Sequence, residues 1–237
     1  MPVHHASPSL LAIETATELC SVAVHCANQI WHVSAHAGQQ HSEMLLPMVR
    51  DVLSQANMTL ADLDAIAFGA GPGSFTGLRI ACGVVQGLAF AQRIPVLPIP
   101  SLEALAQVGS GQVLCAVDAR MGEVYAAHYA VSPDGVIECV RAAQVLKPEA
   151  LLDQMAAQNF ITLIGNAWKI FPVLSDWGRG HAQKIIADVY PDARQILQRA
   201  LVHWAAGLAV SAELAHPLYV RQRIALTTAE REAGQRL

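Results

Sequence analysis

The sequence is poor in charged and in aromatic side chains. Charged residues make up 14% of the 237 positions and the formal net charge is −4, so the chain lacks the strong positive field that holds a phosphate backbone over a large surface. Four Trp, four Tyr and five Phe leave few side chains for base stacking. Both shortages count against a self-standing RNA-binding module, and we expect any RNA to be held mainly by something other than this chain.

Cysteine is also scarce, and no two cysteines have the C-x-x-C spacing of a redox or zinc motif. A disulfide framework or a zinc knuckle is therefore not expected, and a reducing compartment is. The first nine residues have neither the cationic lead nor the apolar run of a signal peptide, so we expect a cytoplasmic protein. The uncharged stretch between Arg79 and Arg93 is shorter than the ~20 residues that span a bilayer, so we expect no membrane association.

Apolar residues, at 53%, are abundant enough for one large core or two smaller ones. Their spacing predicts an α/β chain in which three short strands and alternating helices and strands are followed, after Gly109-Ser110-Gly111, by a second three-strand run with helices. We expect an N-terminal lobe at 1–108, a C-terminal lobe at 109–226 and a mobile polar tail at 227–237. In the first lobe the predicted strands are 10–16, 20–25, 29–37, 65–71 and 95–99, and the predicted helices are 42–57, 75–92 and 101–107. In the second, the predicted strands are 113–120, 123–130, 136–142 and 160–165, and the predicted helices are 148–157 and 191–207.

A glycine-rich run at residues 69–79 joins a predicted buried strand to the uncharged helix. It does not fit a P-loop, because Ser74, Thr76 and Leu78 stand where the second glycine would be needed, and it lacks the third glycine of the dinucleotide fingerprint. Two readings stay open: a tight turn with Ser74 or Thr76 capping the helix, which we favour, and an anion-binding helix N-terminus.

Several motifs together resemble the TsaB family, formerly called YeaZ. They are GPGSFTGLR at 71–79, AIETAT at 12–17, HSE at 41–43, DARMGEVY at 118–125, Gly165-Asn166 and PLYVR at 217–221. The resemblance covers the first half closely and the second half through the later motifs. It implies the two-lobed actin, Hsp70 and sugar-kinase (ribonuclease H-like) fold with a degenerate nucleotide site.

The resemblance also implies a function for the chain. Members of this family pair with TsaD and, with the ATPase TsaE, support formation of N6-threonylcarbamoyladenosine (t6A) at position 37 of tRNAs reading codons that begin with A. TsaD performs the transfer, so we expect an accessory subunit with no catalytic residue and no cofactor, ATP and metal being held by the partner subunits. The family also forms a self-dimer. The alternatives are an independent ATP-dependent enzyme of the sugar-kinase type or a protease-like homologue, but the phosphate turns, general base and nucleophile setting they need are incomplete here.

By resemblance, residual nucleotide contacts would come from Glu14, Thr15 and Asp118. Glu14 stands where the family pattern has Asp, and its longer side chain favours a structural role such as accepting hydrogen bonds from turn amides. Asp118 is followed closely by Arg120, which predicts a structural ion pair.

Three histidines are candidate metal ligands. His32 and His36 have H-x-x-x-H spacing, but on a strand their Cα atoms would lie ~13 Å apart, too far to share an ion. His41 stands alone before a predicted helix, where a cap or surface position is the usual role. We therefore expect no metal site.

Two predicted helices, 42–57 and 75–92, carry more apolar surface than docking on one sheet requires. We expect them to form a two-helix patch that docks a similar pair on TsaD or on a second copy. The small residues of the second helix would let a partner helix approach its backbone closely. The predicted contact residues are Met44, Leu45, Met48, Val52, Thr76, Ile80, Ala81, Gly83, Val84, Gly87 and Leu88.

Overall fold

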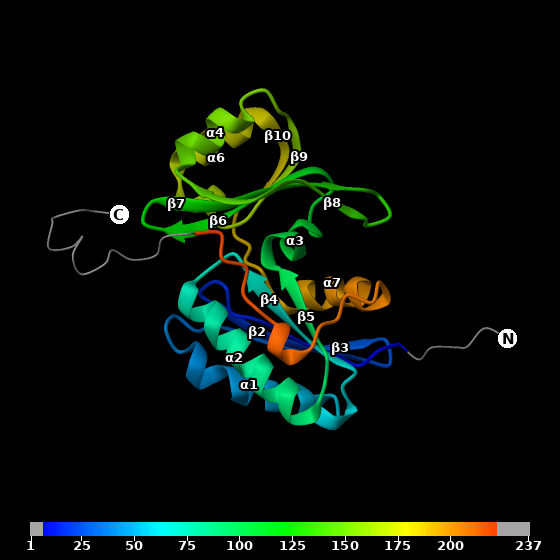
Figure 1. Ribbon diagram of the computed structural model, residues 1–237. Coiled ribbons are helices and arrows are strands. Elements are labelled where there is room, and N and C mark those ends of the chain that lie inside the picture. The colour runs from blue at the N-terminus through cyan, green and yellow to red at the C-terminus, as the bar shows by residue number, and fades with distance from the viewer. Residues whose placement is uncertain (1–6, 222–237) are drawn as a thin grey trace, which may run out of the picture.

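Two five-stranded sheets form two lobes, one above the other in Figure 1, in the computed structural model, which describes residues 7–221. The first lobe contains β1 (Leu10–Glu14), β2 (Leu19–Cys26), β3 (Gln29–His36), α1 (His41–Gln55), η1 (Leu60–Asp62), β4 (Ala65–Gly71), α2 (Phe75–Gln92) and β5 (Val96–Pro100). After α3 (Ser101–Ala106) the second contains β6 (Gly111–Arg120), β7 (Glu123–Val131), β8 (Ile137–Leu146), α4 (Pro148–Met155), β9 (Phe160–Ile164), α5 (Ala167–Ile170), α6 (Pro172–His181) and β10 (Ala182–Ile186). The described chain ends with α7 (Ala193–Ala205) and η2 (Ala212–Leu214).

The two sheets have the same topology. The first has the order β3-β2-β1-β4-β5 and the second, in the same sense, β8-β7-β6-β9-β10. In each sheet the first three strands are antiparallel, and the first strand pairs in parallel with the fourth and the fourth with the fifth. This shared order confirms the predicted α/β fold of two related lobes with ribonuclease H-like sheets. Sequence analysis did not predict α5, α6 and β10.

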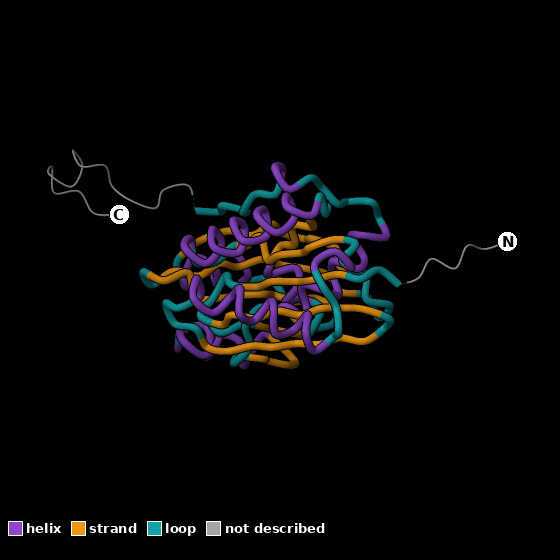
Figure 2. The backbone as a smooth tube through the Cα atoms, turned by 90° about the horizontal axis from the view of Figure 1, so that it is seen from below, coloured by secondary structure: helices purple, strands orange, loops and turns teal. Residues whose placement is uncertain are grey.

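Strand β1 shows why the first sheet needs cover on both faces. Its five residues are all buried. Leu11 and Ile13 belong to the core that α1 and α2 complete, whereas Leu10 and Ala12 belong to a second core on the opposite face. Side chains alternate between the faces of a strand, so a fully apolar strand requires a layer on each side. Helices α1 and α2 lie at the lower end of the molecule in Figure 1. In the view from below, helices accordingly lie in front of the strands (Figure 2).

Helix α7 covers the other face of the first sheet, which corrects the predicted lobe boundaries. Ile196, Leu197 and Ala200 pack with Leu10 and Ala12, although the prediction placed residues 109–226 in the C-terminal lobe. The chain thus returns to the first lobe after β10. The apolar side of α7 must be buried against another apolar surface, and the alanines on this face of the first sheet allow the helix to pack close to the strands. The predicted tail at 227–237 lies outside the described residues.

No helix between residues 7 and 221 is both long enough and apolar enough to cross a membrane.

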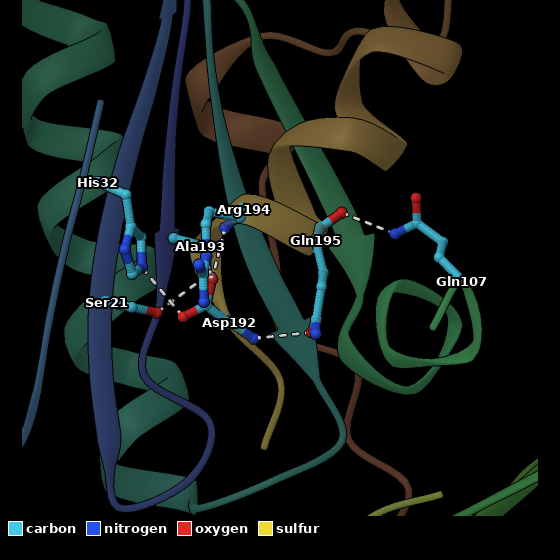
Figure 3. A network of polar contacts seen from close by, with 7 residues as sticks. All are labelled: Ser21, His32, Gln107, Asp192, Ala193, Arg194 and Gln195. Atoms are coloured by element: carbon cyan, nitrogen blue, oxygen red, sulfur yellow. Dashed lines mark hydrogen bonds and ion pairs between the residues drawn. The ribbon is translucent and has the colours of Figure 1, made fainter. Parts of the chain in front are cut away.

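A polar network joins the start of α7 to the first sheet (Figure 3). Asp192 caps α7 by accepting a hydrogen bond from the Arg194 amide at 2.9 Å, and its other carboxylate oxygen lies 3.0 Å from Nε2 of His32 on β3. The Ala193 amide donates to the Ser21 hydroxyl on β2 at 2.9 Å. Burial by itself would raise the pKa of Asp192, but the hydrogen bonds from His32 and Arg194 outweigh it and hold that pKa at about 2.

Asp192→Asn is expected to lower the free energy of unfolding at pH 7 by about 1–2 kcal/mol, as measured by urea denaturation. Asn is as good a helix cap as Asp, so the change removes the charge and keeps the cap. Because the folded-state pKa is lowered, the stabilisation is present above pH 3.8 and is lost as the pH falls toward 2. Asp192→Ala should cost more, since it also removes the cap. Equal stability of Asp192→Asn and the wild type would show that the charge contributes nothing.

Candidate functional sites

A cavity of about 590 Å³ lies where the two lobes face each other. Strands β1, β3 and β4 all end at the same edge of the first sheet. Strand β4 is parallel to β1, and β3 runs in the same direction as β1 because both are antiparallel to β2, which lies between them. The segments after these strands line the cavity, as do the last residues of β6 and Asn166, which follows β9, in the second lobe. Ligands of open α/β sheets usually bind beyond the carboxyl ends of the strands, which makes this cavity the first candidate site.

Glu14, at the end of β1, does not line this cavity. Its carboxylate is fully buried and accepts hydrogen bonds from the Ala16 amide at 2.6 Å and the Ser101 hydroxyl at 2.7 Å. The side chain occupies the space beside Gly69, where a Cβ would overlap the carboxylate. Burial raises the pKa of Glu14 to about 7, although its hydrogen bonds act in the other direction. The hydrogen bond to a turn amide is the structural role predicted for this residue.

Thr15 is also fully buried, and its hydroxyl donates to the Gly77 carbonyl at 2.8 Å. Of the three predicted nucleotide contacts, only Asp118 lines the cavity. Glu14 and Thr15 are therefore corrected to structural positions, because the loop after β4 packs over them. At Gly77 a Cβ would collide with the Thr15 carbonyl, which explains why glycine is needed at that point of the run at residues 69–79.

The turn after β4 has the capped conformation that the sequence favoured. The Ser74 hydroxyl accepts a hydrogen bond from the Gly77 amide at 3.3 Å, which makes Ser74 the N-cap of α2. The amide of Ser74 donates to the Ala16 carbonyl at 2.7 Å, so the glycine-rich turn is tied to the turn between β1 and β2. The anion-binding interpretation of this helix start is compatible with the cap, because the capping hydroxyl binds the Gly77 amide and not the amides of Phe75 and Thr76.

Asp118 takes part in a contact between the lobes. Arg120 lies 3.3 Å from the Asp118 carboxylate and donates to the Glu18 carboxylate of the first lobe at 2.9 Å. This is the predicted Asp118–Arg120 pair, extended by a third residue that sequence analysis missed. Asn166 accepts from the Asp118 amide at 2.9 Å, and Tyr190 donates to Glu18 at 2.8 Å.

Residues 215–221 bridge the same cleft. The Leu218 amide donates to the Ala70 carbonyl at 2.7 Å, and Tyr219 stacks at a tilt on Phe75 of α2 with ring centroids 5.7 Å apart. Further on, Arg221 pairs with Glu123 of the second lobe at 2.6 Å. The family motif at 217–221 is thus one of the segments that join the two lobes beside the cavity.

The second candidate site is the outer surface of α1 and α2. Among the predicted contacts, Leu45, Val52 and Ala81 are fully buried in the core of the first lobe, so they cannot contact a partner. Their spacing puts them on the sheet-facing side of each helix. The remaining eight are accessible: Thr76, Gly83 and Gly87 are exposed, and Met44, Met48, Ile80, Val84 and Leu88 are half-buried and pack against the core edge. We call these eight residues the helical surface.

The helical surface has open space above α2. A Cβ at Gly83 or at Gly87 would meet no heavy atom within 4 Å. Phe90, at the end of the same helix, is 70% exposed. Next to it, a groove of about 550 Å³ is lined by Leu46, Leu53, Met58, Leu60 and Leu88 among others. Half-buried apolar side chains around exposed glycines are typical of a surface where another helix packs.

Similarity to known proteins identifies the family. A family model described as "TsaD: tRNA N6-adenosine threonylcarbamoyltransferase" matches residues 32–230. The tRNA threonylcarbamoyladenosine biosynthesis protein TsaB of Escherichia coli is 37% identical over 91% of this chain and 96% of its own length, and that of Haemophilus influenzae is 32% identical over 91% and 94%. The chain belongs to the TsaB family.

A solved structure agrees with this assignment. YeaZ from Pseudomonas aeruginosa is 39% identical, with a TM-score of 0.79 over 90% of this chain and 99% of that chain. The similarity extends over both lobes, so the α/β architecture described above is that of the TsaB family.

The three histidines considered as metal ligands, His32, His36 and His41, have different surroundings in this TsaB-family chain. His32 pairs with Asp192, and His36 packs edge-on against Tyr190 with ring centroids 5.8 Å apart. His41 is 6% exposed, so the expectation of a surface or capping histidine was wrong, and Gln40 is the N-cap of α1. Within residues 7–221 no three His, Cys, Asp or Glu side chains are placed to hold a metal ion.

Proposed function

We propose that this chain is a non-catalytic subunit that pairs with a TsaD-type protein and supports formation of t6A at position 37 of tRNAs reading codons that begin with A. The names of its TsaB relatives and of the matching family model support a role in this modification. The observation that carries the pairing is the helical surface, where apolar side chains and two exposed glycines lie on the outside of α1 and α2.

Pairing through the helical surface fits its composition. Stable pairing interfaces bury ~2,000 Å² or more and have an apolar centre. In the helical surface Met48, Val84 and Leu88 supply such a centre, and Gly83 and Gly87 allow the backbone of a partner helix to approach closely. A second copy of the chain offers the same surface, so a self-dimer would compete with the heterodimer for it.

The proposed non-catalytic role rests on the state of Glu14 and Asp118, the two acids expected to contact a nucleotide. Glu14 is buried behind the loop after β4, and Asp118 is paired with Arg120, so neither is free to hold a metal-bound phosphate. ATP and metal would then bind on partner subunits, TsaD and TsaE. With a net charge of −4 this chain would contact tRNA only within the cytoplasmic complex.

Reconstitution tests this proposal. The chain alone is expected to hydrolyse ATP no faster than a buffer blank, whereas its addition to a TsaD-type protein, TsaE and a threonylcarbamoyl-adenylate source is expected to raise t6A yield, measured by nucleoside chromatography. The yield should saturate at one chain per TsaD-type protein. ATP turnover by the isolated chain that disappears in Glu14→Ala would instead support a kinase-like enzyme, and unchanged t6A yield without the chain would contradict an accessory role.

A further inference from the structure

The turn between β6 and β7 presents an exposed methionine to solvent. Met121 follows the last residue of β6 and is 56% exposed. Among residues 7–221 the other methionines are less accessible, since three are half-buried against the core of the first lobe and one is buried in the second lobe: Met44, Met48, Met58 and Met155. An oxidant must reach the sulfur atom to react with it, so Met121 is expected to be oxidised before these four.

The sulfur of Met121 lies against a cation from a distant segment. Nη1 of Arg221 donates a hydrogen bond to this Sδ atom at 3.1 Å. Nη2 of the same guanidinium donates to the Ala119 carbonyl at 3.1 Å and to the Glu123 carboxylate at 2.6 Å. One hairpin turn therefore holds the guanidinium through two oxygens and one sulfur. Because a thioether sulfur is a weak acceptor, the contact with Nη1 is the weakest of the three.

This guanidinium stands at the end of segment 215–221, which is attached to the first lobe at its beginning. The Ala215 carbonyl accepts hydrogen bonds from the Cys82 thiol at 3.2 Å and from the Gln86 amide at 2.9 Å, both on α2. Arg221 carries the attachment of the segment to the second lobe. The strength of the hydrogen bonds between Arg221 and the β6–β7 turn therefore affects how firmly the segment links the two lobes.

We propose that Met121 is a site of reversible oxidation by hydrogen peroxide, and that the sulfoxide formed there strengthens the hold of the β6–β7 turn on Arg221. A lone pair of the sulfur attacks one peroxide oxygen, so that an S–O bond forms while the O–O bond breaks. The sulfur loses two electrons, and the departing hydroxide takes the proton of the transferred hydroxyl and leaves as water. Met121 does not line the cavity between the lobes, so this site is separate from the candidate ligand site.

The sulfoxide changes the weakest of the three contacts. Its oxygen is a much better acceptor than the thioether sulfur, and its donor is a charged guanidinium, which makes the hydrogen bond stronger than one between neutral groups. The methionine side chain has several rotatable bonds. Because Met121 is exposed, the oxygen can turn toward Nη1 of Arg221 without displacing a buried group. Oxidation is therefore expected to tighten the link between the lobes, and a methionine sulfoxide reductase is expected to release it.

The test compares the full-length chain before and after mild treatment with hydrogen peroxide. Peptide mass spectrometry should show that Met121 is oxidised at least roughly threefold faster than Met58. Backbone hydrogen exchange in residues 215–221 should then slow by about fivefold, as one stronger hydrogen bond would give, and a methionine sulfoxide reductase should restore the original rate. Unchanged or faster exchange in the oxidised chain would overturn the proposal, as would oxidation of Met121 no faster than that of Met58.

Met121→Leu is the matched control for the peroxide treatment. This variant keeps every cysteine and every other methionine, and leucine fills a similar volume at an exposed position, so the chain should stay folded. It cannot form the sulfoxide at position 121. Peroxide should therefore leave its exchange in residues 215–221 unchanged. A slowing as large as that of the wild type would show that another oxidised group causes the effect.

Met121→Gln tests the stronger acceptor without peroxide. Glutamine has about the length of methionine and carries a carbonyl oxygen, so exchange in residues 215–221 is expected to slow by roughly threefold in the untreated chain. In an Arg221→Met background the same substitution should change nothing, because the donor is gone. A slowing that persists in that background would mean that the effect does not pass through the guanidinium, and it would contradict the proposal.

Discussion

Gly87→Arg is expected to weaken pairing with a TsaD-type protein by a factor of about a hundred or more while leaving the chain folded. A Cβ at Gly87 would meet no described heavy atom beyond its own helix turn within 4 Å, and Arg favours a helix more than Gly by about 1 kcal/mol. The melting temperature should therefore stay the same or rise. A partner helix packed on this position would be forced away, and a charge would be placed in an apolar contact.

Affinity is measured by analytical ultracentrifugation with the purified partner. The control is Gly180→Arg, because Gly180 also has open space at its Cβ but lies on α6 of the second lobe. Gly87 is a sharper test than Val84, whose side chain packs against the core of its own lobe, so that Val84→Arg risks unfolding. A folded Gly87→Arg that pairs as tightly as Gly180→Arg would place the interface away from the helical surface.

Glu14→Gln is expected to stabilise the chain by about 3 kcal/mol at pH 8 and to flatten its dependence on pH. The folded-state pKa of Glu14 is raised from 4.5 to about 7 by burial. The folded chain then holds a proton more tightly than the unfolded chain. The stabilisation is complete below pH 4.5 and is lost as the pH rises through 7. Gln is neutral throughout, and its amide can serve both the Ala16 amide and the Ser101 hydroxyl.

The measurement is urea unfolding of the wild type and Glu14→Gln at several values between pH 5 and pH 8. The two stabilities should differ by less than ~1 kcal/mol at pH 5, the difference should grow by roughly 1.4 kcal/mol per pH unit as the pH approaches 7, and it should level off above pH 7. Glu103→Gln serves as a contrast. The Glu103 carboxylate accepts a hydrogen bond from Arg199 at 2.9 Å. Burial by itself would raise the pKa of Glu103, but His203 and Arg199 outweigh it and lower that pKa. That change should destabilise the chain at neutral pH. Parallel curves for the wild type and Glu14→Gln would show that Glu14 is ionised throughout.

The sequence determined most of the elements and the family. Short β-rich apolar runs and helical spacing depend on neighbouring residues alone, which is why β1 to β9 and α1 to α4 were found within a few residues of their ends. The motif at residues 69–79 likewise predicted the capped turn, because Ser74 and Gly77 act over three positions. In contrast, α5, α6 and β10 are short and carry weak patterns, so local spacing did not reveal them.

Only the tertiary structure decided which face each side chain serves. The apolar residues of α1 and α2 look equivalent in the sequence, yet Leu45 and Ala81 face the sheet while Val84 and Gly87 lie at the outer surface. The placement of α7 on the first sheet and the return of residues 215–221 across the cleft depend on contacts between segments more than a hundred residues apart. The burial of Glu14 and His41 has the same origin, because a side chain's solvent exposure is set by whatever packs over it in space.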